Sequence, residues 1–286
     1  MRSLNEILEG CVASGRSFAA QALAAESAET GSSPDSIRAG LAGRLKDMEF
    51  SVKEAASGGW RGLLVPEEAF LLEEYGKKGT GFSSPFVLTA ARISISVATY
   101  NSAMGRIVAA PTAGSCGILP GMLFACREHL EADDESLIDG LITAAAVGEV
   151  TEARATLAGA SGGCQAECGA AAAMGSAALV TIRGGSPDEV CHAVALTFKS
   201  VLGLVCDPVG GLVESPCIKR NGLLVSLGAL AADFALAGMK SLIPADEVID
   251  AMGQVGRALP ETLRETGLGG LAASPTGREL ARKLLD

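Results

Sequence analysis

The sequence predicts an all-α fold, a single helical domain with ligand-bearing loops at its helix ends. Two observations support this fold class. Ser-Pro pairs repeatedly precede runs in which apolar residues recur every three or four positions, the spacing of one helix face. Sustained alternation of apolar and polar residues, which is typical of a strand, is almost absent. Only residues 93–97 hint at it, in a segment with a helix start signal, so we expect this run to be helical too.

Four Ser-Pro pairs mark helix starts, because the serine side chain can cap the first turn and the proline wastes no amide donor there. The pairs are Ser33-Pro34, Ser84-Pro85, Ser186-Pro187 and Ser274-Pro275. The third is the strongest, since Glu189 completes a capping box. Apolar residues at helical spacing continue to Leu204, so we expect this helix to lead straight into Cys206.

Helical periodicity also predicts helices across residues 37–48, 137–142 and 248–259, the last of them ended by Pro260. The most hydrophobic stretch, residues 222–239, is long enough to span a bilayer. Its small residues and Asp233 indicate a buried helix or helix pair instead.

The beginning of the chain, MRSLNEILEGC, has the pattern of a surface helix and lacks the unbroken apolar run of a secretory signal. We therefore expect a cytoplasmic protein with no membrane partner. The formal net charge of −10 repels polyanions, so nucleic acid is not expected as a partner either. We expect one domain over residues 1–286, with a Gly-, Ser- and Lys-rich seam at 75–85 separating a helical N-terminal section, 1–80, from the remainder, 81–286.

The chain has eight cysteines, and in the cytoplasm we expect them to be reduced. Cys11, Cys126 and Cys191 lie singly in predicted helices, where a free cysteine commonly packs as a small apolar side chain. The others fall in three segments that combine Gly, Pro and Cys, each predicted to be a loop at a helix end. These segments are residues 111–117, 161–169 and 206–222.

Thiolates on such loops suggest a metal site. Zinc is disfavoured, because it prefers closer cysteine pairs or histidine, and we expect neither His129 nor His192 to be a ligand. An iron-sulfur cluster accepts thiolates that are scattered in the sequence. Cys168, one helical turn after Cys164, is either a further ligand or a packed residue. The candidate ligands are Cys164, Cys206 and Cys217.

Three motifs, GGCQAECG, CDPVGGLVESPCIKRNG and LRETGLGGLAASPTGRELA, resemble the alpha chain of the iron-sulfur-dependent L-serine dehydratases, also called L-serine ammonia-lyases. The resemblance extends from about Pro85 to the C-terminus. It implies a helical catalytic domain that holds a 4Fe-4S cluster through only three cysteines, here Cys164, Cys206 and Cys217. The fourth iron would then be open to substrate, as the open position of a catalytic metal site is.

The resemblance also implies that L-serine is the substrate and that elimination of water yields pyruvate and ammonia. Iron on the hydroxyl and carboxylate of serine would ease loss of both the hydroxide and the α proton, which a positioned base removes. Glu167 is the candidate base, or else a carboxylate that accepts a hydrogen bond from its own helix or loop.

For substrate binding, Arg220 is suited to a bidentate grip on a carboxylate, with Lys219 beside it, although a solvated basic turn is the alternative. Thr112 and Ser115, together with nearby amides, are candidates to cradle the carboxylate or amino group. Cys116 is expected to pack.

The chain departs from the family in two ways. It ends RELARKLLD, without the terminal cysteine that can occupy the open iron in single-chain relatives. RATLAG stands at 154–159, where relatives often have Asn-Ala-Ser-Ile-Ser-Gly. The substrate loop of the family's beta chain is also missing from this sequence, so we expect a heteromeric enzyme in which this chain alone has little or no activity.

Four alternatives remain. An L-cysteine desulfidase would use the same cluster with sulfide as the leaving group. A non-catalytic iron-sulfur protein would have its fourth iron sealed by Cys168 or Cys116. A pyridoxal-phosphate dehydratase lacks support, because no lysine has a convincing Schiff-base setting. The last alternative is a helical protein rich in Ala and Gly whose thiols are merely packed.

Overall fold

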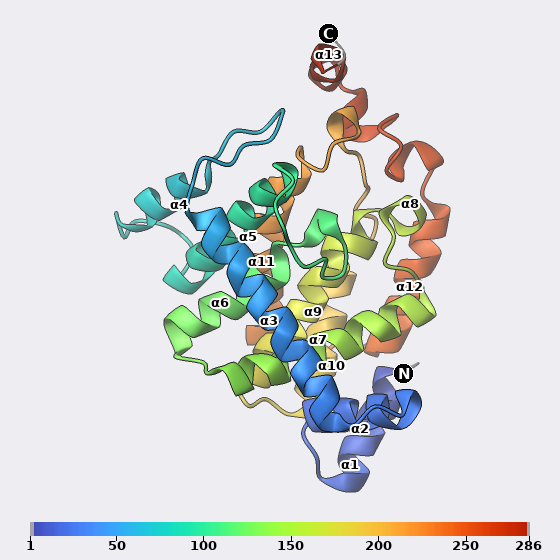
Figure 1. The fold of residues 1–286 in the computed structure, drawn as a ribbon. Coiled ribbons are helices and arrows are strands. Elements are labelled where there is room, and N and C mark those ends of the chain that lie inside the picture. Colours follow the sequence, from blue (N-terminus) through green and yellow to red (C-terminus); the bar gives the residue numbers. More distant parts are fainter. Residues whose placement is uncertain (1–2, 285–286) are drawn as a thin grey trace.

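The computed structural model describes residues 3–284 and confirms the all-α fold: within this range the chain forms thirteen α-helices and no strand (Figure 1). The α-helices are α1 Leu4–Ser14, α2 Phe18–Thr30, α3 Pro34–Ala56, α4 Ala69–Gly76, α5 Pro85–Ser102, α6 Ile118–Leu130, α7 Asp134–Arg154, α8 Gly159–Gly162, α9 Ala170–Ile182, α10 Pro187–Lys199, α11 Cys217–Leu236, α12 Ala245–Ala258 and α13 Pro275–Lys283. One turn of π-helix and four 3-10 turns stand between them. The turns are η1 Ala113–Ser115, the π-helical η2 Gln165–Gly169, η3 Val209–Gly211, η4 Glu261–Leu263 and η5 Gly270–Ala273.

All four predicted Ser-Pro starts are confirmed, each with the serine side chain accepting an amide of the first turn. The capping box of Ser186 and Glu189 is present as well. The expected end of α10 is wrong, because the helix stops at Lys199 and does not run to Cys206. Gly203 turns the chain there with a φ of 84°, and its amide donates to the buried side chain of Gln165. A tertiary contact therefore ends the apolar pattern early.

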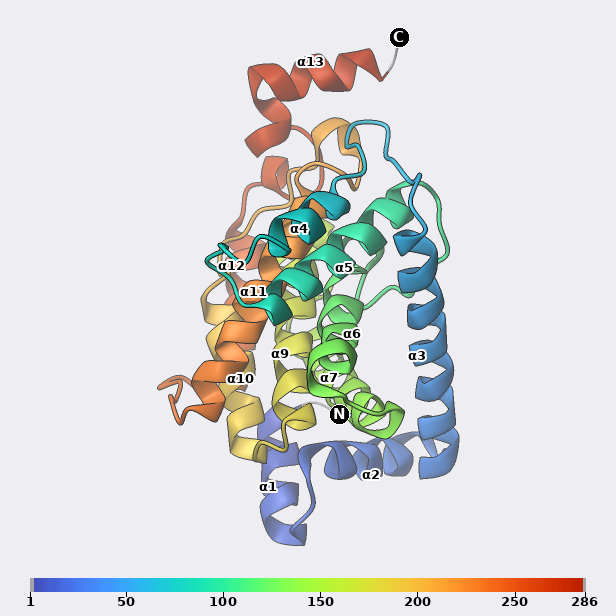
Figure 2. The same cartoon turned by 90° about the vertical axis from the view of Figure 1, so that its left-hand side faces the viewer.

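Helix α9 is the centre of the bundle and packs against α6, α7, α10 and α11 (Figures 1 and 2). Its first eleven residues, AAAAMGSAALV, are all buried. A helix that is apolar all round has to lie inside a protein, and small side chains let neighbouring backbones come close. At Gly228 of α11, a Cβ atom would lie 2.8 Å from the carbonyl oxygen of Ala172 and 2.5 Å from Met122 Cε.

The N-terminal helices wrap one end and one side of this bundle. Figure 2 shows α1 and α2 at the end opposite α13, with α3 running up the side. Helix α1 packs on α10 and α12, and Leu4 and Ile7 belong to the common core. The buried carboxylate of Asp246 in α12 accepts the amides of Leu4 and Asn5, at 2.9 and 3.1 Å. The first helix is thus tied to residues near the other end of the sequence.

The apolar stretch at 222–239 lies mostly in the single helix α11, which starts earlier than predicted, at Cys217. The helix is buried on one face only. Leu223 and Leu230 on its other face are exposed, as is Asp233. No helix in the described range combines the length and the apolar character that crossing a bilayer requires.

Candidate metal centre

A cavity of about 150 Å³ lies where the three Gly- and Cys-bearing segments meet, near the N-terminal ends of α9 and α11. A single water needs only about 10–15 Å³ of such space, so the cavity can hold a larger group. Four thiols and two carboxylates line it. They belong to Cys164, Cys168, Cys206, Cys217, Glu167 and Glu265.

Cys164 comes directly before the π-helical turn Gln165–Gly169, so this segment is helical and was wrongly predicted to be a loop. Turns of π-helix are uncommon in proteins, and those that occur are often found at functional sites. The buried Gln165 side chain donates to the carbonyl oxygens of Gly162 and Met252, at 2.9 and 3.1 Å, and holds the turn in place. Gly163, with a φ of 77°, is needed because a Cβ atom there would lie 2.8 Å from the Leu204 oxygen.

Cys206 is fixed by a segment close to the C-terminus. Its amide donates to the Leu263 oxygen at 2.9 Å, and its carbonyl oxygen accepts the Glu265 amide at 2.8 Å. The neighbouring Asp207 is buried and accepts from Arg220 at 3.2 Å and from the Leu271 amide at 2.8 Å. Backbone pairing and a buried carboxylate therefore set where this sulfur lies.

Cys217 is the first residue of α11, and the loop before it is held by Glu214. The buried carboxylate of Glu214 accepts the amides of Leu63, Leu64 and Val65 at 2.9, 2.8 and 3.0 Å. The N-terminal part of the chain thus takes part in shaping the cavity, although none of its side chains lines it among the described residues.

Glu167 lies inside the cavity. Thr112 Oγ1 donates to its Oε1 at 2.9 Å, and the Cys206 thiol donates to its Oε2 at 3.6 Å. Burial raises the pKa of Glu167, which makes the ionised carboxylate a stronger base. A side chain at position 159 would displace the Glu167 carboxylate, because a Cβ atom there would lie 2.3 Å from Glu167 Oε2 and 3.3 Å from Cys206 Sγ.

Of the residues predicted to bind substrate, some line the cavity and others do not. Thr112 lines the cavity, whereas Ser115 is fully buried and hydrogen-bonds with Thr112. Arg220 does not line the cavity, and its guanidinium donates to the Val205 oxygen at 2.9 Å as well as to Asp207. Lys219 points away and pairs with Glu68 at 2.6 Å.

Of the two cysteines considered as a seal for the fourth iron, only Cys168 lines the cavity. Asn221 Nδ2 donates to its sulfur at 3.8 Å. Cys116 belongs to the hydrophobic core, where burial raises the pKa of its thiol to about 12. Cys11, Cys126 and Cys191 lie on α1, α6 and α10, as predicted, and all eight cysteines are free.

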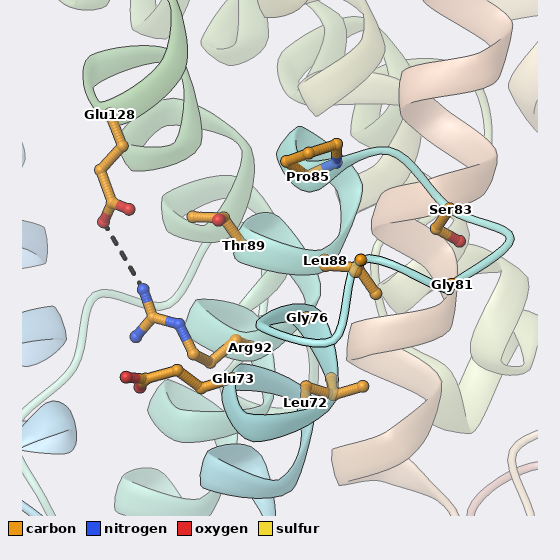
Figure 3. A pocket seen from close by; sticks show the side chains of 11 residues that line it. Leu72, Glu73, Gly76, Gly81, Ser83, Pro85, Leu88, Thr89, Arg92 and Glu128 are labelled. Carbon is orange, nitrogen blue, oxygen red and sulfur yellow. Dashed lines mark ion pairs between the residues drawn. The ribbon is translucent and has the colours of Figure 1, made fainter.

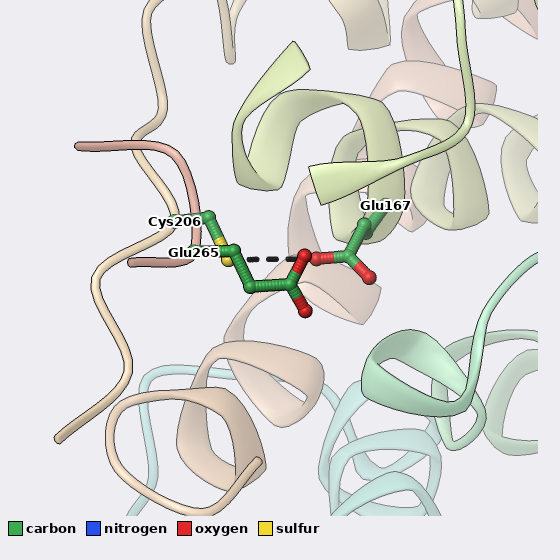
Figure 4. A group of neighbouring side chains, drawn as sticks. All are labelled: Glu167, Cys206 and Glu265. Carbon is green, nitrogen blue, oxygen red and sulfur yellow. Dashed lines mark hydrogen bonds between the residues drawn. The ribbon is translucent and has the colours of Figure 1, made fainter. Parts of the chain in front are cut away.

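Glu265 is a residue of the cavity that the sequence did not single out. Ligand atoms of Glu167, Cys206 and Glu265 all lie within 4.8 Å of one another (Figure 4). The sequence feature that could have identified Glu265 is weak, because it is only a glutamate just before a run of glycines in the LRETGLGG motif. Nothing in the sequence indicated that this segment returns to Cys206.

The donor set suits a cationic group that takes thiolate ligands. Burial raises the pKa of Cys217 to about 12, and repulsion from Cys164 contributes. Burial also raises the pKa of Cys206, with further contributions from Glu167 and Cys164. A bound metal deprotonates its thiol ligands and would remove the repulsion among them. The amides at the start of α11, beside Cys217, favour the negative charge of thiolates and sulfides. The residues therefore fit an iron-sulfur group.

A larger cavity, of about 570 Å³, lies on the surface between α4, α5 and α6 (Figure 3). Its charged groups are Glu73, Arg92 and Glu128, and Arg92 is 3.6 Å from Glu128. No cysteine lines it. The volume of a cavity therefore does not identify the metal site. The chemistry of the residues that line the cavity identifies it.

The fold and the cavity define a helical protein with a buried cluster of thiols beside a carboxylate. The chain belongs to the serine dehydratase alpha chain family, whose model matches residues 13–272. It is 49% identical over 244 residues to a probable L-serine dehydratase alpha chain of Bacillus subtilis, covering 83% of this chain and 81% of that one. It is likewise 49% identical over 212 residues to the L-serine dehydratase alpha chain of Peptoniphilus asaccharolyticus, covering 74% and 73%. A longer L-serine dehydratase of Streptomyces coelicolor is 40% identical over 176 residues, 61% of this chain and 39% of its own length.

Proposed function

We propose that this chain is the catalytic half of an L-serine dehydratase, a carbon-nitrogen lyase that converts L-serine to pyruvate and ammonia. The observation that carries the proposal is one cavity lined by Cys164, Cys206, Cys217 and Glu167, in a chain of this family. The names of the relatives suggest the substrate. The cavity offers thiolate ligands for a Lewis-acidic metal group next to a base, and this combination can assist both loss of hydroxide and removal of the α proton from serine.

The proposed cofactor is a 4Fe-4S cluster held by Cys164, Cys206 and Cys217, with one iron left for substrate. When bound, it supplies a Lewis acid that polarises the serine hydroxyl and offsets the negative charge developing at the α carbon. Cys168 is proposed to remain a packed thiol, because its S–H group donates to the Gly114 oxygen at 3.7 Å.

Glu167 is the proposed base. Thr112 holds its Oε1, and Oε2, which accepts from the Cys206 thiol, would become free to take the α proton once Cys206 is a thiolate ligand. The same oxygen can return this proton to the departing hydroxide, which leaves as water. The product, 2-aminoacrylate, tautomerises to an imine and is hydrolysed to pyruvate and ammonium. Arg220 is proposed to position the Cys206 loop and not to bind the substrate carboxylate, because its guanidinium is engaged by the Val205 oxygen, Asp207 and the Cys164 sulfur.

We further propose that a separate beta chain completes the enzyme. The relatives that match over most of their length are named alpha chains, whereas the longer relative has more than half of its length outside the match. This pattern supports a second part that is fused in some proteins and separate in others.

Reconstituting the chain with iron and sulfide under nitrogen, adding the beta chain and supplying L-serine tests the proposal. We expect visible cluster absorbance and release of pyruvate, with little or no turnover by the chain alone. L-cysteine is the matched second substrate, and faster release of sulfide than of pyruvate would favour a desulfidase. A complex that binds no iron, or that binds it and turns over neither substrate, would overturn the proposal.

A further inference from the structure

Glu265 has a backbone conformation that glutamate rarely adopts. Its φ of 64° is in the left-handed region, which is unfavourable for residues with a Cβ atom and accessible to glycine. Glycine occurs at 267, 269 and 270 in the same segment, yet position 265 has a glutamate. Met104 and Glu131 also have a positive φ, but of these three residues only Glu265 lines the cavity.

The backbone of Glu265 is fixed relative to the proposed ligand Cys206. Its amide donates to the Cys206 oxygen at 2.8 Å, and Leu263, two residues earlier, accepts the Cys206 amide at 2.9 Å. Figure 4 shows the carboxylate extending from this pairing toward Glu167. The side chain therefore approaches the cavity from the wall that carries Cys206, facing the proposed base.

The carboxylate of Glu265 has no hydrogen-bond or ion-pair partner within residues 3–284, and its side chain is exposed. Two other acidic residues near the cavity are engaged: Asp207 by Arg220 and the Leu271 amide, and Glu214 by three amides. Glu265 instead faces the carboxylate of Glu167, which repels it. Glu167 already accepts from Thr112 and Cys206, so Glu265 is the carboxylate of the pair that is left for a ligand, and two carboxylates held close together suit a cationic one.

We infer that Glu265 binds the α-ammonium group of the substrate and makes the cavity selective for amino acids over hydroxy acids. This inference rests on the proposed function and adds a specificity residue to it. Oxygens of Glu265 and Glu167 within 4.8 Å of each other can both accept from one nitrogen, because each N–H···O bond spans about 2.9 Å. No lysine or arginine among the described residues lines the cavity, and Arg220, which interacts with Cys164 from outside it, is held by Val205 and Asp207.

The same contact brings the substrate to the base. The α carbon is one bond from the ammonium nitrogen, so a substrate held by Glu265 has its α proton beside Glu167. Glu265 is therefore expected to determine substrate affinity more than the rate of proton removal.

The test compares ligands with and without an amino group in the cluster-loaded complex with the beta chain. Glu265→Gln removes the charge and keeps the size, and Glu265→Asn is a second variant that tolerates a positive φ. Glu261→Gln is the matched control, an exposed glutamate four residues earlier that does not line the cavity. Dissociation constants for L-serine and for 3-hydroxypropanoate, which is serine without its amino group, are measured by calorimetry under nitrogen. Turnover is measured in parallel.

We expect Glu265→Gln or Glu265→Asn to weaken L-serine binding on the order of tenfold or more, as loss of a charged hydrogen bond does, and to leave 3-hydroxypropanoate unchanged. KM should rise more than kcat falls, and Glu261→Gln should match the wild type. Equal effects on both ligands, or none, would overturn the inference. Selective loss of L-serine binding in a complex without turnover would support the ammonium site while refuting the proposed function. A wild-type complex that neither turns over nor binds L-serine would refute both.

Discussion

The carboxylate of Glu214 accepts the backbone amide of Leu64 at 2.8 Å, although the two residues are 150 positions apart in the sequence. The amides of Leu63 and Val65 donate to the same carboxylate. Glu214 stands three residues before Cys217, so this contact attaches the N-terminal part of the chain to the loop that carries two proposed ligands. The N-terminal section is therefore part of the support of the site.

Replacing Glu214 with Gln should destabilise the chain by about 2 kcal/mol, because an amide NH2 group would face backbone donors in a buried place. Thermal unfolding measures this change, and iron content after reconstitution shows whether the loop still presents Cys217. Glu247→Gln is the control, an exposed glutamate on α12. If the two variants have the same melting temperature and iron content, Glu214 has no supporting role.

Replacing Arg220 should disturb the Cys206 loop and not substrate binding alone. Arg220→Met removes the donors to Val205 and Asp207, and leaves the buried carboxylate without its charged partner, so we expect loss of most of the bound iron and of about 3 kcal/mol of stability. Lys219→Met, the neighbouring residue in a surface ion pair, should change stability by less than about 1 kcal/mol. Normal iron content together with a raised KM in Arg220→Met would instead favour a direct role in binding the substrate carboxylate.

The cysteines of the cavity should differ in what they do for the cluster. Alanine at Cys164, Cys206 or Cys217 is expected to abolish cluster absorbance, whereas Cys168→Ala should retain it because its sulfur is not needed as a ligand. Iron and sulfide content and the visible spectrum measure the outcome, with Cys116→Ala as a control in the core. Loss of the cluster in Cys168→Ala would indicate a sealed fourth iron and a non-catalytic protein.

Two buried cysteines that do not line the cavity should make the fold sensitive to alkali. Burial raises the pKa of both Cys116 and Cys126 to about 12, above the ordinary value of 9.0. The unfolded chain therefore loses these protons first as pH rises. Their contribution to stability is fully present below pH 9 and is lost between about 9 and 12, at up to about 1.4 kcal/mol per pH unit for each thiol.

Urea unfolding between pH 8 and 11 tests this dependence. Cys116→Ala and Cys126→Ala should each flatten the decline of the unfolding free energy with pH. Val147→Ala, which also shortens a fully buried side chain but removes no titrating group, should lower the free energy equally at every pH. Parallel pH profiles in all of these variants would contradict the expectation.

Local signals allowed much of the fold to be predicted, because a helix start is decided within one turn. The Ser186 capping box and the three other Ser-Pro pairs are examples. The end of α10 was predicted wrongly, because the side chain of Gln165, from a distant turn, captures the Gly203 amide. Sequence periodicity carries no information about such a partner.

In the candidate site, too, local motifs predicted some features, and contacts between distant segments determined the others. Motifs were sufficient to name Cys164, Cys206, Cys217 and Glu167, which the structure places around one cavity. Motifs could not indicate where the donors of Arg220 point, since Val205 and Asp207 decide that direction. They also missed Glu265, whose position follows from backbone pairing with Cys206.

That pairing bears on how the protein matures. Cys206 is anchored by residues 263–265, which leave the ribosome after all three proposed sulfur ligands have been synthesised. A nascent chain therefore cannot complete the pocket until residues 263–265 have emerged and paired with Cys206. Correct placement of the proposed iron-sulfur group thus depends on a segment that is synthesised after all of its sulfur ligands.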